Sequence, residues 1–319
     1  MQPLRRHDTN PELSPFLVAC QAPAYRTELG VMLHGRSEEI LKTHSHELKG
    51  KVQLIFTSPP FPLNKKKRYD NYRGEQYFLW LSSYASIFRS LLTDDGSIVI
   101  ELGNAWEPGQ PLMSTLALES LLAFLRAGNL NLCQQFVCHN PARLPSPAAW
   151  VTVRRERLTD SYTNLWWMAR TPRPKANNRN VLQPYSEAMK QLIERQSYNT
   201  KKRPSDHSIS AKSFLKDHGG SIPSNVLQFS NTSSRDDYLT FCRAKKLRPH
   251  PARMAIGLPE FFIRFLTSPG DIVLDPFGGS NTTGAAAESL QRRWITIETE
   301  ASYVLGSKGR FPIANYSAL

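Results

Sequence analysis

Short hydrophobic segments rich in β-branched residues alternate with segments of helical periodicity at both ends of this chain. Consecutive strands lie parallel only when a crossover joins them, and an intervening helix supplies that crossover. The alternation therefore predicts an α/β fold with a mostly parallel sheet covered by helices on both faces. The expected strands are 31–34, 52–57, 97–102, 130–137, 164–168, 271–275 and 294–298. The first expected helix begins at Ser37, which acts as its N-cap. Further helices are expected at 76–92, 112–126, 258–266 and 281–290, and a last one starts near Glu300.

The alternation is lost in the middle of the chain. Residues 171–247 show weak periodicity and many turn-forming residues. We interpret them as an inserted domain or a large loop assembly rather than as part of the α/β core.

The excess positive charge lies in one contiguous third of the chain. The whole chain has a net charge of +13; residues 141–253 hold 21 Lys and Arg against 8 Asp and Glu, whereas the rest holds 19 of each. A basic face of this kind suits the phosphates of a nucleic acid. The alternative is a generally basic protein whose charges are solvated.

Several other classes of protein are disfavoured. No apolar run is long enough to span a membrane, and no apolar stretch follows Met1, so we expect no signal peptide and no membrane association. We expect the protein in the cytoplasm, or wherever the cell keeps its DNA. The cysteines form no CxxC pair, which argues against a metal site or a disulfide framework; they are Cys20, Cys133, Cys138 and Cys242.

A glycine turn follows the strand expected at 271–275. Gly278 and Gly279 allow the backbone to approach a ligand closely, and the next helix presents free N–H groups at its start. Glu298 ends the following strand, where a carboxylate can accept both hydroxyls of a ribose. The spacing differs from GxGxxG, so the unit alone indicates either a nucleoside cofactor or a tight structural turn.

A second motif, Thr57-Ser58-Pro59-Pro60-Phe61, ends the strand expected at 52–57. Prolines lack an N–H and stiffen the loop, which leaves carbonyl groups able to accept hydrogen bonds from an amino group. Phe61 offers a face on which a base can stack. Taken alone, the motif is better explained as a turn that terminates a strand, with Phe61 packed at the surface.

Together the two motifs resemble a known family. TSPPF, DPFGGSNTT and the upstream His250-Pro251-Ala252-Arg253 are similar to the amino-methyltransferases of bacterial restriction–modification systems, specifically the PvuII-type cytosine-N4 enzymes of the permuted β group. The resemblance covers nearly the whole chain. Serine before the two prolines favours cytosine N4 over adenine N6.

The resemblance implies a circularly permuted, seven-stranded-type methyltransferase sheet that uses S-adenosylmethionine. Residues 1–170 would form the catalytic half, 171–247 the target-recognition region and 248–319 the cofactor-binding half. The implied partner is double-stranded DNA, and a cognate restriction endonuclease would act on the same site. We expect a monomer.

The resemblance also implies roles for individual residues. Ser58, Pro59, Pro60 and Phe61 would hold the target base, and Glu101 would stand where relatives have an aspartate that works with the serine. The cofactor would lie against Asp275, Pro276, Phe277, Gly278, Gly279, Ser280, Asn281, Thr282 and Glu298. Its methionine side would be walled by residues 250–254, which include His250 and Pro251, and also by Pro259 and Phe262. His34-Gly35-Arg36 departs from the family, because relatives often carry Gly-Asp near the adenine and Arg36 reverses that charge.

Two basic clusters are candidate DNA contacts. Lys65, Lys66, Lys67 and Arg68 follow the Pro-Pro loop and would contact phosphate beside a flipped base, and Lys201, Lys202 and Arg203 lie in the basic region. The alternatives are a solvated charge run for the first cluster and a mobile loop for the second.

These residues predict a direct methyl transfer. Ser58 Oγ and the Pro59 carbonyl would orient the exocyclic amine, and Glu101 would help remove its proton through Ser58 or water; alternatively the proton leaves to solvent. No cysteine nucleophile is needed, because nitrogen attacks. The competing hypotheses are an adenine-N6 methyltransferase, an RNA or protein methyltransferase and a non-catalytic DNA-binding module. A NAD-dependent enzyme is the weakest alternative, because its glycine spacing differs from the one found here.

Overall fold

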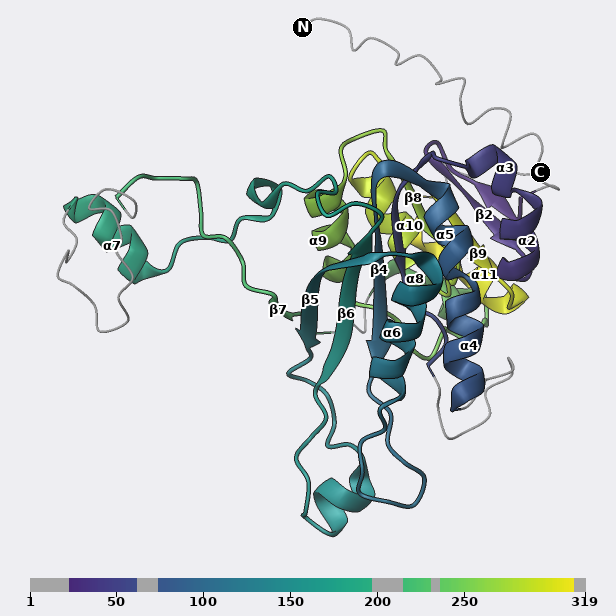
Figure 1. The fold of residues 1–319 in the computed structure, drawn as a ribbon, viewed down its shortest axis with the longest axis horizontal. Coiled ribbons are helices and arrows are strands. Elements are labelled where there is room, and N and C mark those ends of the chain that lie inside the picture. The colour runs from purple at the N-terminus through teal and green to yellow at the C-terminus, as the bar shows by residue number, and fades with distance from the viewer. Residues whose placement is uncertain (1–22, 62–73, 197–214, 231–235, 313–319) are drawn as a thin grey trace, which may run out of the picture. The chain divides into compact units, whose positions relative to one another are not determined.

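The computed structural model describes residues 23–61, 74–196, 215–230 and 236–312. Within these ranges, nine strands form one sheet in the order β1-β2-β9-β8-β3-β4-β6-β5-β7 (Figure 1). The strands are β1 (Tyr25–Arg26), β2 (Gly30–His34), β3 (Val52–Thr57), β4 (Leu92–Gly103), β5 (Asn131–His139), β6 (Tyr162–Ala169), β7 (Val226–Gln228), β8 (Ile272–Asp275) and β9 (Arg293–Glu298).

The centre of the sheet is parallel. β2, β9, β8, β3 and β4 run in the same direction, whereas β6 is antiparallel to both β4 and β5. All six residues of β3 are buried, which is typical of a strand covered on both faces. The predicted mostly parallel α/β fold is therefore confirmed, with the late strands β8 and β9 placed between β2 and the early strand β3, as a permuted order requires.

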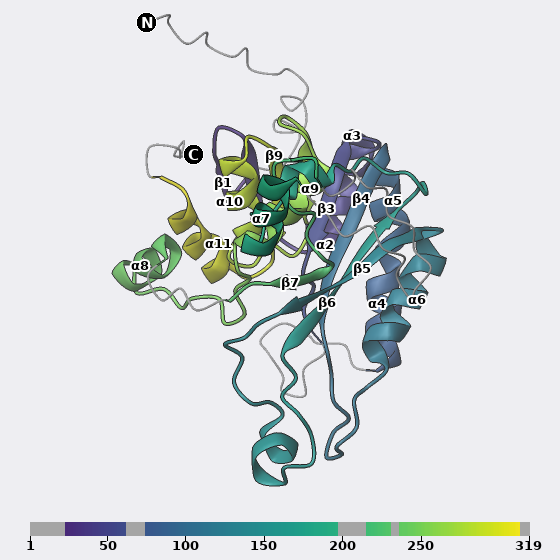
Figure 2. The ribbon, with the colours of Figure 1, turned by 90° about the vertical axis from the view of Figure 1, so that its left-hand side faces the viewer.

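Helices cover both faces of the sheet (Figure 2). Alternate strand residues enter two separate apolar cores: Ile55 and Ile98 face one, and Phe56 and Val99 face the other. The first core contains residues of α2 (Ser37–Thr43), α3 (Ser45–Leu48), α4 (Glu75–Ser83), α5 (Ala85–Leu91) and α6 (Leu116–Gly128). The second contains residues of α9 (Gly257–Leu266), α10 (Thr282–Ser289) and α11 (Ala301–Ser307).

Three predicted helix boundaries are wrong. The helix expected at 76–92 is two helices, α4 and α5, divided at Tyr84, and β4 already begins at Leu92. Residues 94–96, which separate the expected helix from the strand expected at 97–102, lie within β4, where the pairing with β3 passes from Leu92 to Ser97 through a register shift. The helix expected at 112–126 begins only at Leu116, since Met113 instead forms a bridge with Trp106.

The chain divides into two compact units. The larger contains Met1–Ala176 and Asn225–Leu319, and therefore includes β7 and α8 (Asp237–Ala244). The smaller unit, Asn177–Ser224, contains α7 (Glu187–Arg195), which Ser186 caps by accepting from Met189 N. The smaller unit spans fewer residues than the region predicted at 171–247. The role of that region in target recognition stays a prediction.

Membrane-spanning helices and clustered metal ligands are both absent from the described part of the chain. No helix there has the length and apolar character needed to cross a membrane. The same residues contain no group of three His, Cys, Asp or Glu side chains placed to hold a metal ion.

Candidate cofactor and catalytic site

The carboxyl ends of the parallel strands meet at one edge of the sheet. β3 ends at Thr57 and β8 at Asp275, and these two strands are neighbours. Their chains leave the sheet in different directions, since α10 packs on one face and α4 on the other. Ligands of open parallel sheets bind at such a switch point.

A buried hydrogen bond joins the two motifs at this edge. Thr57 Oγ1 donates to Asp275 Oδ1 over 2.7 Å, and Thr283 Oγ1 donates to Asp275 Oδ2 over 2.6 Å. The backbone N–H of Phe277 also donates to Asp275 Oδ1. Burial raises the pKa of Asp275, and these three bonds offset only part of that shift. Asp275 therefore fixes the start of both the glycine turn and α10.

The glycine turn is held by Glu298. Its Oε2 accepts from Gly279 N and its Oε1 from Glu300 N, each over 2.8 Å. Burial raises the pKa of Glu298 despite these bonds. Each carboxylate oxygen has two acceptor positions, so both retain capacity for a ligand hydroxyl.

Gly279 adopts a φ of +52°, and a Cβ there would lie 3.2 Å from the imidazole of His250. Both facts favour glycine at this position. His250 in turn packs edge-on against Tyr303, with ring centroids 4.6 Å apart. The turn and the segment that begins at His250 therefore form two adjacent walls.

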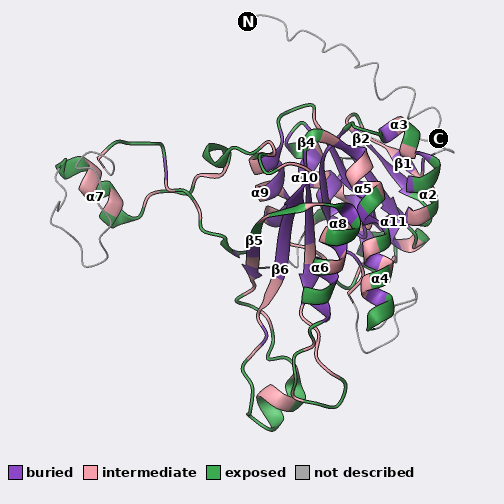
Figure 3. Cartoon of the chain, viewed as in Figure 1, coloured by how far each residue is buried: buried purple, intermediate pink, exposed green. Residues whose placement is uncertain are grey.

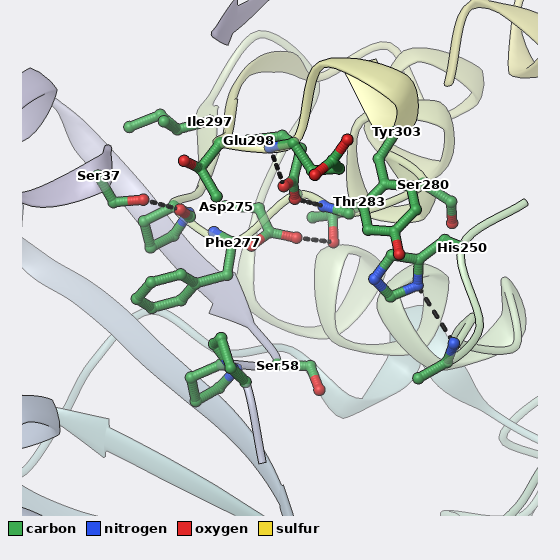
Figure 4. Close-up of a pocket in the computed structure, with 18 of the residues that line it drawn as sticks. Ser37, Ser58, His250, Asp275, Phe277, Ser280, Thr283, Ile297, Glu298 and Tyr303 are labelled. Carbon is green, nitrogen blue, oxygen red and sulfur yellow. Dashed lines mark hydrogen bonds between the residues drawn. The ribbon is translucent and has the colours of Figure 1, made fainter. Parts of the chain in front are cut away.

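These walls enclose a pocket of about 520 Å³, a size suited to a cofactor (Figure 4). Seventeen of the predicted residues line it: Ser58, Pro59, Pro60, Phe61, Glu101, His250, Ala252, Arg253, Met254, Asp275, Pro276, Phe277, Gly278, Gly279, Ser280, Thr282 and Glu298.

Other predicted residues lie elsewhere. Pro251 is outside the pocket lining, and Phe262 packs in the core 5.6 Å from Phe56 by ring centroids. Pro259 is buried in α9. Asn281 is a fully buried left-handed N-cap: its Oδ1 accepts from Gly284 N and its Nδ2 donates to Tyr25 Oη. Asn281 thus shapes the turn from behind.

The catalytic end of the pocket is built on β3 and β4. Glu101 accepts a hydrogen bond from Thr163 Oγ1 over 2.9 Å and another from Ser58. Burial raises the pKa of Glu101, and these bonds and the charge of Arg143 oppose the shift. The Phe61 ring lies over Gly103, where a Cβ would be only 2.8 Å from the ring.

The opposite end contains residues that the sequence analysis missed. Trp80 Nε1 donates to Glu38 Oε1 over 3.0 Å, and both side chains line the pocket. Burial raises the pKa of Glu38, but hydrogen bonds from Trp80 and Tyr84 outweigh it, so the net pKa is lowered. Arg36 lies 4.0 Å from Glu38 and 3.6 Å from Glu39. The charge reversal expected from Arg36 is therefore balanced locally.

Ser37 has a different role from the one predicted. It is the first residue of α2 rather than its N-cap, because the extended residue before the helix is Arg36. Its hydroxyl donates to the Pro276 carbonyl and so connects α2 to the glycine turn. The signal in the sequence was a serine between the end of β2 and the helix that follows it.

The pocket is acidic although the chain is basic. Five carboxyl groups line it, on Glu38, Glu101, Asp275, Glu298 and Glu300. Its two arginines both form ion pairs. Arg36 pairs with Glu38 and Glu39, and Arg253 pairs with Asp236 over 2.9 Å. Such a lining favours a cationic ligand. The predicted DNA contacts at Lys65, Lys66, Lys67 and Arg68, and at Lys201, Lys202 and Arg203, lie outside the described residues.

Comparison with known proteins identifies the family. The N6/N4 methyltransferase profile, described as DNA methylase, matches residues 52–308. The Type II methyltransferase M.PvuII of Proteus hauseri is 43% identical over 297 residues, which cover 92% of this chain and 87% of that protein. M.BamHI of Bacillus amyloliquefaciens is 25% identical over 86% of this chain and 56% of its own length.

Solved structures of DNA methyltransferases have the same fold as this chain. The cytosine-N4-specific PvuII DNA methyltransferase superposes with a TM-score of 0.73 at 36% identity, covering 92% of this chain and 90% of that one. The complex of M1.HpyAVI with S-adenosylmethionine shares the fold, with a TM-score of 0.51 at 21% identity. The family match over most of the chain, together with a site in which both motifs meet, shows that this chain belongs to the DNA methylase family.

Proposed function

We propose that this protein transfers a methyl group from S-adenosylmethionine to N4 of a cytosine in double-stranded DNA. The observation that carries the proposal is the Thr57–Asp275 hydrogen bond, which brings the Ser-Pro-Pro-Phe loop and the glycine turn to one pocket. The cytosine-N4 specificity printed for the similar PvuII enzyme supports the choice of target.

The pocket suits the cofactor along its length. Glu298 retains acceptor positions for the ribose hydroxyls, and Trp80 and Phe277 offer aromatic surface to an adenine, with Glu38 as an acceptor for its amino group. His250, Tyr303 and paired Arg253 line the methionine side. Bound S-adenosylmethionine supplies an activated methyl group on a positively charged sulfur, which the acidic lining accommodates.

Ser58 and Glu101 act on the target base. The cytosine amine is a weak nucleophile, because its lone pair is delocalised into the ring. Ser58 Oγ and the Pro59 carbonyl accept hydrogen bonds from the amine and turn its lone pair outward. As the nitrogen–methyl bond forms and the sulfur–methyl bond breaks, one amine proton is lost. Glu101, in hydrogen-bonding contact with Ser58, accepts that proton directly from the serine or through water.

The same proposal covers partners and organisation. A target cytosine inside a duplex must be flipped out, and the Phe61 ring gives it a stacking surface. Residues 1–170 and 248–319 form the two halves of the catalytic domain, and 171–247 reads the sequence. We infer that the protein acts as a monomer beside the cellular DNA and protects the site that a cognate endonuclease cuts.

The test is transfer of labelled methyl groups to DNA, followed by mass spectrometry of the nucleosides. We expect N4-methylcytosine from the wild type and a loss of about a hundredfold or more in kcat for Ser58→Ala, at unchanged cofactor affinity. Ser86→Ala is the control, because Ser86 is exposed on α5. N6-methyladenine as the product would reject the cytosine assignment, and a fully active Ser58→Ala would reject the role of the loop.

A further inference from the structure

Two loops leave the sheet beside the catalytic residues and form one arm. Residues 104–115 follow β4, and residues 140–161 connect β5 to β6. β6 pairs antiparallel with β4 through Gly103 and Thr163, and with β5 through Tyr162 and His139. Both loops therefore start at the sheet edge that carries Glu101, and Figure 1 shows them projecting together beyond the ends of β4, β5 and β6.

The arm has a defined structure. Asp160 is buried at its base and accepts from Asn104 Nδ2 over 2.8 Å and from Trp106 Nε1 over 3.4 Å. Further out, Arg157 Nε donates to the Pro111 carbonyl over 3.0 Å, which joins the two loops. A single turn of π-helix, Ala149–Val153, forms part of the longer loop. These bonds hold the arm in place relative to the catalytic edge.

The surface of the arm combines apolar side chains with arginines. The three most exposed large apolar side chains in the described ranges all lie on 140–161: Leu158 at 89%, Leu144 at 81% and Val153 at 77%. The same loop carries four arginines against two acids, one of which is the buried Asp160. Arg154 lies over the Trp150 ring, 4.9 Å from its centroid, and Arg155 is exposed. In Figure 3 the two loops are coloured mostly as exposed or intermediate.

We propose that this arm binds duplex DNA at the target, with Leu144 and Leu158 entering the base stack and Arg154 and Arg155 contacting the flanking phosphates. The inference rests on the proposed function. Apolar wedges beside arginines are the means by which proteins unstack and distort a duplex. Flipping a cytosine leaves a gap in the stack that an apolar side chain can fill. The positive charge favours DNA over a second, equally basic copy of this chain.

The decisive experiment uses a short duplex that carries the methylated site mapped from DNA of cells expressing the protein. In Leu144→Ala/Leu158→Ala, methyl transfer to the matched duplex should fall by about tenfold or more, because an apolar side chain that fills the gap offsets part of the cost of unstacking the base. On a duplex whose target cytosine is mispaired, flipping is already easy, so most of the loss should disappear. Cofactor affinity should not change.

The arginines are tested by salt dependence. Arg154→Ala/Arg155→Ala should reduce the slope of log binding constant against log salt by about 2, since each phosphate contact contributes about 0.9. The matched controls are Leu118→Ala/Leu122→Ala and Arg126→Ala, whose side chains are exposed on α6, outside the two loops of the arm. Both controls should bind and methylate as the wild type does.

The outcomes are distinguishable. An active wild type with fully active arm variants, an equal loss on matched and mispaired duplexes, or an unchanged salt slope would overturn the arm proposal alone. A change of oligomeric state in the leucine variant, in place of a change in flipping, would assign the surface to a second copy and also overturn it. A wild type that transfers no methyl group to any DNA would overturn the proposed function, and the arm proposal with it.

Discussion

The Thr57 hydroxyl donates a hydrogen bond of 2.7 Å to the carboxylate of Asp275, although the two residues are 218 positions apart in the chain. Thr57 is fully buried at the end of β3, and Asp275 is buried at the end of the neighbouring β8. The bond therefore fixes the distance between the loop that begins at Ser58 and the turn that begins at Pro276.

Replacing Thr57 tests this connection. Thr57→Val keeps the shape but leaves a buried carboxylate oxygen with one donor fewer. We expect the free energy of unfolding to fall by about 1–3 kcal/mol, and the cofactor to bind more weakly, as measured by urea unfolding and calorimetry. Thr57→Ser keeps the hydroxyl and should therefore retain most of the wild-type stability and most of the cofactor affinity. Equal stability of the valine variant and the wild type would show that the bond contributes nothing.

Gly103 should control the position of the catalytic aromatic ring. A Cβ at this residue would lie 2.8 and 2.9 Å from two Phe61 ring carbons, closer than packed atoms approach, so Gly103→Ala must displace the ring. We expect slower methyl transfer at unchanged cofactor affinity. In a double-mutant cycle with Phe61→Ala, the two losses should be clearly non-additive, because both act through the same ring. Additive losses would contradict this explanation.

Glu101 should set the acid limb of the pH profile. Burial raises its pKa, and the carboxylate is the form that accepts a proton. Activity should therefore fall as pH decreases through this raised pKa, at a pH above the ordinary glutamate value of about 4.3. Thr163→Val removes a bond that lowers the pKa, so the limb should move to higher pH. The measurement is kcat against pH at saturating cofactor.

Glu101→Gln is the companion variant. It cannot titrate, so the limb should disappear and kcat should fall by about a hundredfold or more. Unfolding midpoints across the same pH range separate loss of catalysis from loss of fold. A glutamine variant that keeps the wild-type rate would assign proton removal to solvent.

Glu298 should dominate the affinity for the cofactor. Glu298→Ala removes the proposed ribose acceptor and also the partner of Gly279 N and Glu300 N. We expect binding to weaken by about tenfold or more, as loss of charged hydrogen bonds implies. Exposed Glu119→Ala on α6 is the control, and calorimetry with S-adenosylmethionine is the measurement. Unchanged affinity would remove Glu298 from the cofactor site.

Much of the catalytic site could be predicted because its residues adjoin strand ends. Ser58 directly follows β3, Asp275 and Glu298 end their strands, and Glu101 lies near the end of β4. Parallel strands end at a common edge. Glu38 and Trp80 were missed because they lie on separate helices and meet only when α2 and α4 pack beside the turn. Asn281 shows the reverse error, since the motif includes it but its side chain turns into the protein.

The alternation of strands and helices, the two motifs and the separation of charge can be recognised in the amino-acid sequence, because periodicity, proline and glycine act locally and need no partner. The folded chain alone reveals that β3 lies beside β8 and that Thr57 reaches Asp275. It also reveals an acidic pocket within a basic chain, and exposed leucines and arginines that share one arm at the catalytic edge. These relationships depend on packing between distant segments, and no local pattern encodes which distant residues a buried side chain will meet.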